Sequence, residues 1–111
     1  MSAALASGCA NEHGKFLAYA DKLFEAQDAW TKAKDATVLL KSYAPATGLN
    51  VADFGKCLDD KKYQDLITAS LADGQGFGVA ETPAIFVGTQ LESGTIKYEV
   101  IKNDIEEQLA K

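Results

Sequence analysis

A short apolar run between two chain-breaking residues most constrains how this chain can fold. Ala84 to Val87 reads Ala-Ile-Phe-Val, which suits a pleated sheet; it follows Pro83 and precedes Gly88. Because no polar residue alternates within the run, it predicts a strand buried on both faces. Gln90 to Ser93 follows two residues later and predicts an antiparallel hairpin. Since an isolated hairpin is marginal in water, it must pack on helices of this chain or pair with strands outside it.

Length and composition indicate one small globular domain. The chain has 111 residues, of which 47% are hydrophobic, enough to form a core. No apolar run approaches the roughly 18 residues of a membrane span. The first residues, Met1 to Leu5, lack a basic region, so we expect no intact signal peptide at this end.

The charge pattern argues against nucleic acid as a partner. The net charge is -5, and all 11 basic residues are lysines. Arginine, whose planar fork is the usual tool for phosphate and base recognition, is missing, and the lysines form no stripe. We therefore expect no nucleic-acid partner and no cofactor with a phosphate clamp.

Most of the remaining chain is expected to be helical, with a connection at Asp28 to Lys34 that carries Trp30. Asp35 and Asn50 are expected to cap the helices that follow them. Asp59 and Asp60 are expected to open a longer helix. The expected helices are Ser2 to Glu12, Lys15 to Gln27, Ala36 to Ala44, a short one from Val51 that turns Phe54 and Cys57 inward, the one after Asp60 with Tyr63, Leu66, Ile67, Ser70 and Leu71 inward, and Tyr98 to Leu109.

Few residues suggest chemistry on their own. The glycine-rich stretch 73–78 follows a helix and precedes a strand, the reverse of a dinucleotide loop, so it indicates a helix-ending turn. Cys9 and His13 are four apart on a helix, but no second ligand pair accompanies them, so we expect no metal site. The two cysteines, Cys9 and Cys57, allow either one disulfide or two buried thiols.

Several short motifs occur in a characteristic order and spacing along the whole chain. These are Gly8-Cys9-Ala10-Asn11-Glu12-His13-Gly14-Lys15-Phe16, Leu23-Phe24, Phe54 with Cys57-Leu58-Asp59, Gly78-Val79 with Thr82-Pro83, and Tyr98-Glu99. In their succession, rather than through any one motif, they resemble the DsbA-like thiol–disulfide oxidoreductases of the thioredoxin superfamily.

The resemblance implies a helix-rich α/β chain with a partial thioredoxin-like fold. Residues 1–77 would be the helical insertion of the family, and residues 78–111 would be a cis-proline loop, a hairpin and the last helix. Because no C-x-x-C occurs here, we expect the redox segment to lie upstream of Met1 and assign no catalytic residue. The substrate-binding loop maps onto Thr82 and Pro83. Glu81 stands where the family commonly has glycine, and Ala84 where it commonly has threonine.

The resemblance also implies how the cysteines pair and what the chain does. Some family members join the positions of Cys9 and Cys57 in a structural disulfide, which suggests an extracytoplasmic setting. The implied function is part of a thiol:disulfide oxidoreductase acting on extended or unfolded proteins, inactive alone. A non-catalytic peptide- or protein-binding module is the alternative, and a small helical interaction domain is a third interpretation.

The open side of the hairpin suggests a second copy as a partner. With strands on one side only, Ala84 to Val87 would leave unpaired backbone groups beside apolar side chains. We therefore expect a homodimer through this edge, with coverage by the chain's own helices as the alternative.

Overall fold

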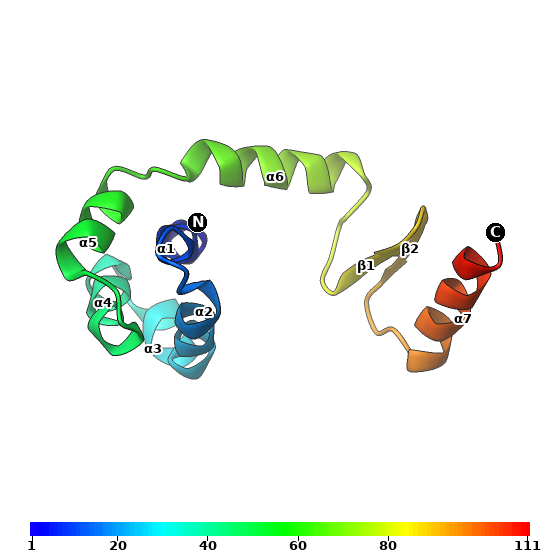
Figure 1. Cartoon of the computed structure of the whole chain (residues 1–111), viewed down its shortest axis with the longest axis horizontal. Coiled ribbons are helices and arrows are strands. Elements are labelled where there is room, and N and C mark those ends of the chain that lie inside the picture. Colours follow the sequence, from blue (N-terminus) through cyan, green and yellow to red (C-terminus); the bar gives the residue numbers. More distant parts are fainter. The chain divides into compact units, whose positions relative to one another are not determined.

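The computed structural model covers residues 1–111 and confirms the helix-rich α/β class (Figure 1). One antiparallel hairpin accompanies seven α-helices and one short 3-10 helix. In chain order the elements are α1 (Ser2–Asn11), α2 (Phe16–Glu25), α3 (Gln27–Lys32), α4 (Thr37–Ser42), η1 (Pro45–Thr47), α5 (Val51–Asp59), α6 (Gln64–Gly76), β1 (Ala84–Val87), β2 (Gln90–Ser93) and α7 (Tyr98–Leu109).

The chain divides within α6 into two compact units, residues 1–69 (the N-terminal unit) and 70–111 (the C-terminal unit). Every buried hydrophobic residue belongs to the N-terminal unit. These residues are Leu5, Ala6, Cys9, Ala10, Tyr19, Leu23, Leu40, Tyr43, Ala44, Leu49, Phe54, Cys57 and Leu58. The C-terminal unit therefore consists of a hairpin and helices without a closed core.

Helix α1 lies at the centre of the N-terminal unit, where it contacts α2, α4 and α5. Its buried residues recur at the spacing of one helix face, and the other residues of the helix are exposed or half-buried. Ala6, Cys9 and Ala10 have no exposed surface, and their small side chains let the neighbouring helices approach closely.

Tyr19 links three helices of this core. Its ring packs on Phe54 of α5 with centroids 5.2 Å apart, and its hydroxyl donates to the Leu40 carbonyl of α4 at 2.8 Å. The hydrogen bond satisfies the one polar atom of an otherwise buried aromatic side chain. Burial raises the pKa of Tyr19, so the hydroxyl stays protonated.

Helix α5 ends in a Schellman turn whose left-handed position holds a lysine. Lys61 has φ 50°, its N–H donates to Leu58 O at 3.1 Å, and the Lys62 N–H donates to Cys57 O at 3.2 Å. Three other helical segments end with the same hydrogen-bond pattern, each with glycine at this position: Gly14, Gly48 and Gly78. Lys61 is the one residue with a Cβ that must adopt the left-handed conformation.

Replacing Lys61 by glycine is expected to stabilise the N-terminal unit. The left-handed conformation costs a non-glycine residue about 1–2 kcal/mol, and the greater freedom of glycine in the unfolded chain offsets part of this. We expect Lys61→Gly to raise the free energy of unfolding in urea by about 0.5–1 kcal/mol. Lys61→Ala, which removes the same charge but keeps a Cβ, is the control and should bring no such gain. Equal stability of the two variants would contradict the strain at this position.

The segment expected to be a connection is partly helical, so that prediction was wrong. Residues 27–32 form α3, and the indole N–H of Trp30 donates to Leu23 O at 2.7 Å. The segment has no apolar period, because Trp30 is its one large apolar residue. Its alanine, glutamine and lysine are nevertheless good helix formers, and the Trp30 hydrogen bond joins the segment to α2.

The caps and boundaries between α4 and α6 met the expectations in part. Asn50 accepts the Asp53 N–H at 2.9 Å, which confirms its cap, and Asp35 accepts the Thr37 N–H at 2.9 Å one residue before the N-cap of α4. Asp59 and Asp60 do not open a helix: α5 ends at Asp59, and the next helix begins only at Gln64. The Schellman turn at the end of α5 is the reason.

The prediction of an inward face on α6 was largely wrong. Tyr63 and Ile67 are half-buried against the core, whereas Leu66 and Leu71 are 63% and 56% exposed, and Ser70 is exposed. Helix α6 continues from one unit into the other, so its residues do not share one packing surface. An apolar stripe shows which side chains favour burial and does not show whether anything covers them.

The hairpin has the boundaries expected from the sequence. Ala84 to Val87 pairs antiparallel with Gln90 to Ser93, and Val87 lies opposite Gln90. Gly88, with φ 62°, takes the first position of the two-residue turn, where a type II′ turn requires glycine. An added Cβ there would lie 2.6 Å from the Gln108 side chain of α7, so the glycine also allows the last helix to approach.

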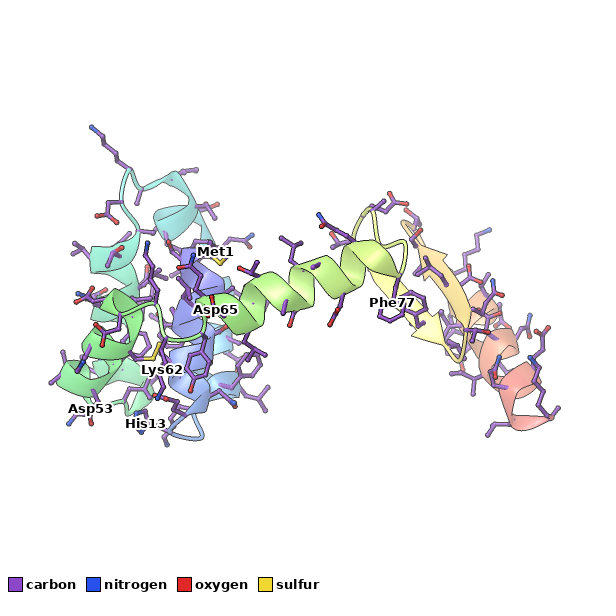
Figure 2. The ribbon with its side chains drawn as sticks, turned by 90° about the horizontal axis from the view of Figure 1, so that it is seen from above. Met1, His13, Asp53, Lys62, Asp65 and Phe77 are labelled. Atoms are coloured by element: carbon purple, nitrogen blue, oxygen red, sulfur yellow. A yellow bond between two sulfur atoms is a disulfide. The ribbon has the colours of Figure 1, made fainter.

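Strand β1 is not buried on both faces, which corrects the expectation from its apolar composition. Ile85 and Phe86 are 40% and 44% exposed. Helix α7 contacts the strand. Phe77, which is labelled in Figure 2, packs edge-on against Phe86 with ring centroids 6.3 Å apart. The sheet has two strands only, so one edge of β1 has no partner in this chain. A homodimer in which a second copy of the chain pairs with this edge remains a prediction.

Candidate functional site

The Thr82–Pro83 loop is an exposed turn directly before β1. The peptide bond between the two residues is cis, and Glu81, Thr82 and Pro83 are all exposed. The Gly94 N–H at the end of β2 donates to Pro83 O at 3.0 Å. This hydrogen bond extends the hairpin ladder by one pair and holds the loop at the end of the sheet.

The backbone of Thr82 is available for pairing. Neither its N–H nor its carbonyl makes a hydrogen bond within the chain. In an antiparallel ladder successive residues alternate between facing the paired strand and facing away from it. Because Pro83 faces β2, Ala84 and Phe86 face the open edge of β1. Thr82 lies just before the regular strand, and its unpaired backbone groups are accessible to an extended peptide.

Glu81 precedes this loop and lies against the turn that follows β2. An added Cβ at Gly94 would be 3.3 Å from the Glu81 carboxylate oxygen, and Gly94 itself has φ 75°. The close approach and the positive φ both favour glycine at position 94. The carboxylate at position 81 is thereby placed at the same end of the sheet as Thr82 and Pro83.

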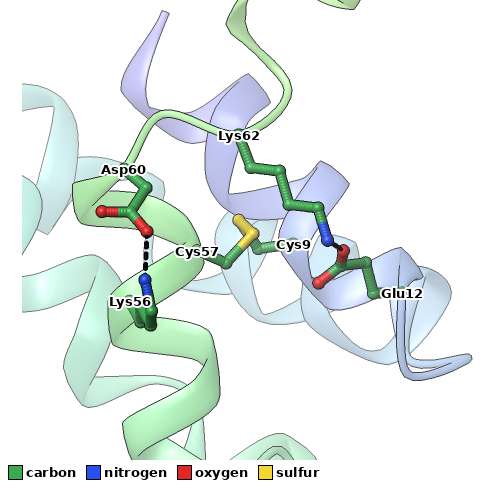
Figure 3. A network of polar contacts seen from close by, with 6 residues as sticks. All are labelled: Cys9, Glu12, Lys56, Cys57, Asp60 and Lys62. Atoms are coloured by element: carbon green, nitrogen blue, oxygen red, sulfur yellow. Dashed lines mark hydrogen bonds and ion pairs between the residues drawn. A yellow bond between two sulfur atoms is a disulfide. The ribbon is translucent and has the colours of Figure 1, made fainter.

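The second predicted feature, the disulfide between Cys9 and Cys57, is present. It joins α1 to α5 across 48 residues of sequence, with Cα atoms 5.9 Å apart (Figure 3). Cys9 has no exposed surface, and Cys57 is 7% exposed. The bond therefore lies within the core and leaves no free cysteine in the chain.

Removing the disulfide is expected to cost much of the stability of the N-terminal unit. A loop of this length corresponds to about 4 kcal/mol in the chain-entropy model. We expect the double variant Cys9→Ala, Cys57→Ala to unfold at a much lower urea concentration than the oxidised protein, followed by far-UV circular dichroism. Dithiothreitol should lower the midpoint of the wild type and leave the double variant unchanged. A wild-type midpoint unaffected by complete reduction would contradict this expectation.

Two ion pairs flank the disulfide. The Lys62 ammonium donates to the Glu12 carboxylate at the end of α1, and Lys56 donates to Asp60 at 2.7 Å (Figure 3). These four residues, together with Asp53 and Cys57, line a hollow of about 330 Å³. Lys62–Glu12 joins the residues after α5 to α1, the same two parts of the fold that the disulfide joins.

The Lys62–Glu12 ion pair shifts the pKa of both residues. The hydrogen bond from Lys62 lowers the pKa of Glu12 below its ordinary value, and the same bond raises the pKa of Lys62. Because the folded-state pKa of Glu12 is lowered, its contribution is present above the ordinary carboxyl pKa. It is lost as the pH falls through the folded-state value. The contribution of Lys62 is lost at the alkaline end, as the pH rises through its raised pKa.

Glu12→Gln is expected to reduce the acid sensitivity of the fold. At neutral pH the variant should be less stable than the wild type. The difference in stability between the two proteins should begin to narrow as the pH falls below the ordinary pKa of glutamate, where the unfolded wild type takes up a proton first. It should close once the pH is below the lowered pKa of Glu12, where the folded wild type has lost the same charge. Urea unfolding at a series of pH values down to 3 measures this, with Asp65→Asn as a control carboxylate outside the three ion pairs. A gap independent of pH would show that the charge of Glu12 does not act on stability.

Other candidates from the sequence do not form a site. The sulfur of Cys9 is bonded to Cys57, so it is not free to join His13 as a metal ligand. No group of three His, Cys, Asp or Glu residues is placed to hold a metal ion. The glycine-rich stretch forms the end of α6, and Gly78 closes its Schellman turn. No helix is long and apolar enough to cross a membrane.

Comparison with known proteins places the chain in a family. A family model described as Thioredoxin matches residues 1–107, nearly the whole chain, so the protein belongs to the thioredoxin family. The helices, the hairpin and the disulfide are consistent with a partial thioredoxin-like fold. No curated protein and no solved structure matches the chain.

Proposed function

We propose that this chain is the substrate-holding part of a DsbA-like thiol:disulfide oxidoreductase. Residues 1–77 would be the helical insertion, and residues 78–111 would be the C-terminal part of the thioredoxin fold. The observation that carries the proposal is the exposed loop at Thr82 and Pro83, whose free backbone groups border an open strand. Membership of the thioredoxin family supports it.

In this proposal the redox cysteines belong to a C-x-x-C segment outside these 111 residues. Both cysteines of the chain are joined in the buried disulfide, so neither is free to act as a nucleophile. In the exchange reaction a thiolate attacks a disulfide sulfur, a mixed disulfide forms, and a second thiolate resolves it. Two electrons and two protons thus pass between the C-x-x-C pair and the substrate cysteines. The loop at Thr82 would hold the substrate peptide extended during both steps.

The buried disulfide also supports an extracytoplasmic location. Such bonds persist in oxidising compartments and are rare in the cytosol. A structural disulfide that joins two helices of the core needs such a setting to form in the cell.

A non-catalytic peptide-binding module is the second candidate. It is favoured by the same fact that leaves these residues without redox chemistry, the engagement of both cysteines in one structural bond. The two candidates share the peptide-binding loop and differ in whether a dithiol acts beside it.

Peptide pairing tests the part that both candidates share. We expect an extended peptide to bind the chain and to shift the backbone amide signal of Thr82 and of its neighbours in ¹H–¹⁵N NMR spectra. The same peptide with N-methyl groups at alternate residues lacks the donors that pairing needs, and it should bind much more weakly. Equal affinity of both peptides would contradict backbone pairing at this loop.

Redox assays then separate the two candidates. The chain alone should not catalyse the reduction of a protein disulfide above background, since its cysteines are locked in the core. Adding the C-x-x-C segment of the parent protein should restore catalysis if the oxidoreductase proposal holds. Catalysis by the chain alone that disappears in Cys9→Ser would overturn the structural assignment of the disulfide.

A further inference from the structure

The negative charge of this protein lies mainly in the C-terminal unit. Residues 70–111 contain seven carboxylates and three lysines, a charge of -4 out of the total of -5. All three ion pairs of the structure, Lys41–Asp59, Lys56–Asp60 and Lys62–Glu12, belong to the N-terminal unit. The carboxylates of the C-terminal unit therefore have no cationic partner within the chain.

One of these carboxylates borders the open backbone at the end of β1. Glu81 is exposed, it directly precedes Thr82, and its carboxylate lies against Gly94. Gly94 in turn donates to Pro83 O, so the charge is held at the loop rather than at a distance from it. A strand that paired with Thr82 would carry its own side chains past this carboxylate.

We propose that Glu81 selects extended peptides that carry a lysine or arginine beside the residue paired with Thr82. This inference rests on the proposed function, because it requires a peptide at the loop. Glu81 lies outside β1, and its carboxylate lies beside Gly94 at the end of the sheet. Lysine and arginine carry their charge on long, flexible side chains, so a basic residue of a peptide at Thr82 can extend towards this carboxylate.

Charge also distinguishes this occupant from a second copy of the chain. A second C-terminal unit would bring another charge of -4 to the same edge, and the two would repel each other at low ionic strength. A basic peptide would instead be attracted by the whole unit and positioned by Glu81. The observations therefore favour a peptide with a basic residue at this edge.

Matched peptides test the selection. A set of uncharged extended peptides carries one lysine at each of three successive central positions, and parallel sets carry glutamine or glutamate there. Binding to the 111-residue chain is measured by fluorescence anisotropy at 20 and 300 mM salt. We expect one lysine position to bind about two- to fivefold more tightly than its glutamine counterpart, the effect of one exposed ion pair. Glutamate there should bind more weakly, and high salt should reduce both differences.

Two variants assign the effect to one carboxylate. Glu81→Gln should abolish the preference for lysine over glutamine peptides. Glu106→Gln removes the same charge from the exposed surface of α7 and should retain the preference.

The results that contradict this inference are distinguishable from those that contradict the proposed function. Equal affinity for lysine and glutamine peptides, or a preference that survives in Glu81→Gln, overturns the selection by Glu81 and leaves the proposed function standing. Failure of every peptide to bind overturns the proposed function together with this inference. If sedimentation shows a dimer that excludes the peptides, and Ile85→Lys dissociates it, a second copy occupies the edge and the inference is wrong.

Discussion

The contact between α1 and the end of α5 is the interaction on which the N-terminal unit depends. Three interactions of different kinds join α1 to the end of α5. They are the Cys9–Cys57 disulfide, the packing of small α1 side chains, and the Lys62–Glu12 ion pair. Lys61 lies between Cys57 and Lys62 and adopts a conformation that favours glycine. A strained residue persists where its surroundings over-determine it. Here a covalent bond four residues before and an ion pair one residue after hold Lys61 in place.

The C-terminal unit, in contrast, has no closed hydrophobic core. It has no fully buried hydrophobic residue, its sheet has two strands, and Phe77 and Phe86 pack on each other while both stay exposed in part. Forty-two residues with so little burial lie below the size at which a lone core is sufficient. The stability of the hairpin must therefore depend on further contacts along the open edge and the exposed faces. The same lack of cover leaves Thr82 accessible.

How much could be predicted from the sequence depended on how local each signal was. The bounds of β1, β2 and α7 were predicted correctly, because Pro83, Gly88 and the apolar pattern are local features. The cap at Asn50 is local in the same sense. Burial was predicted less well, since it depends on what lies opposite. The apolar composition of β1 and of α6 indicates a preference for burial, but Ile85, Phe86, Leu66 and Leu71 are exposed in the structure.

The same distinction between local and non-local signals applies to the residues of the candidate site. Residue spacing alone left the pairing of Cys9 with Cys57 open, and only the family resemblance pointed to the bond that the structure contains. The Lys62–Glu12 pair has a separation of 50 residues, for which no sequence pattern exists. Glu81 was visible in the sequence as a departure from the usual glycine, without a reason for it. Its placement against Gly94 became clear only when the end of β2 was seen to return to the loop.

The two units therefore differ in how their charged and backbone groups are paired. The N-terminal unit has nearly balanced charge, contains all three ion pairs and encloses its sulfurs in the core. The C-terminal unit carries carboxylates without ion-pair partners, and the backbone of Thr82, just before β1, is unpaired. Free backbone groups bind any extended chain, because every residue except proline offers the same donor and acceptor. Discrimination between peptides must then come from side chains beside that backbone. Glu81 is the charged residue nearest to Thr82 in sequence, and this is why a single carboxylate can influence which peptides the loop accepts.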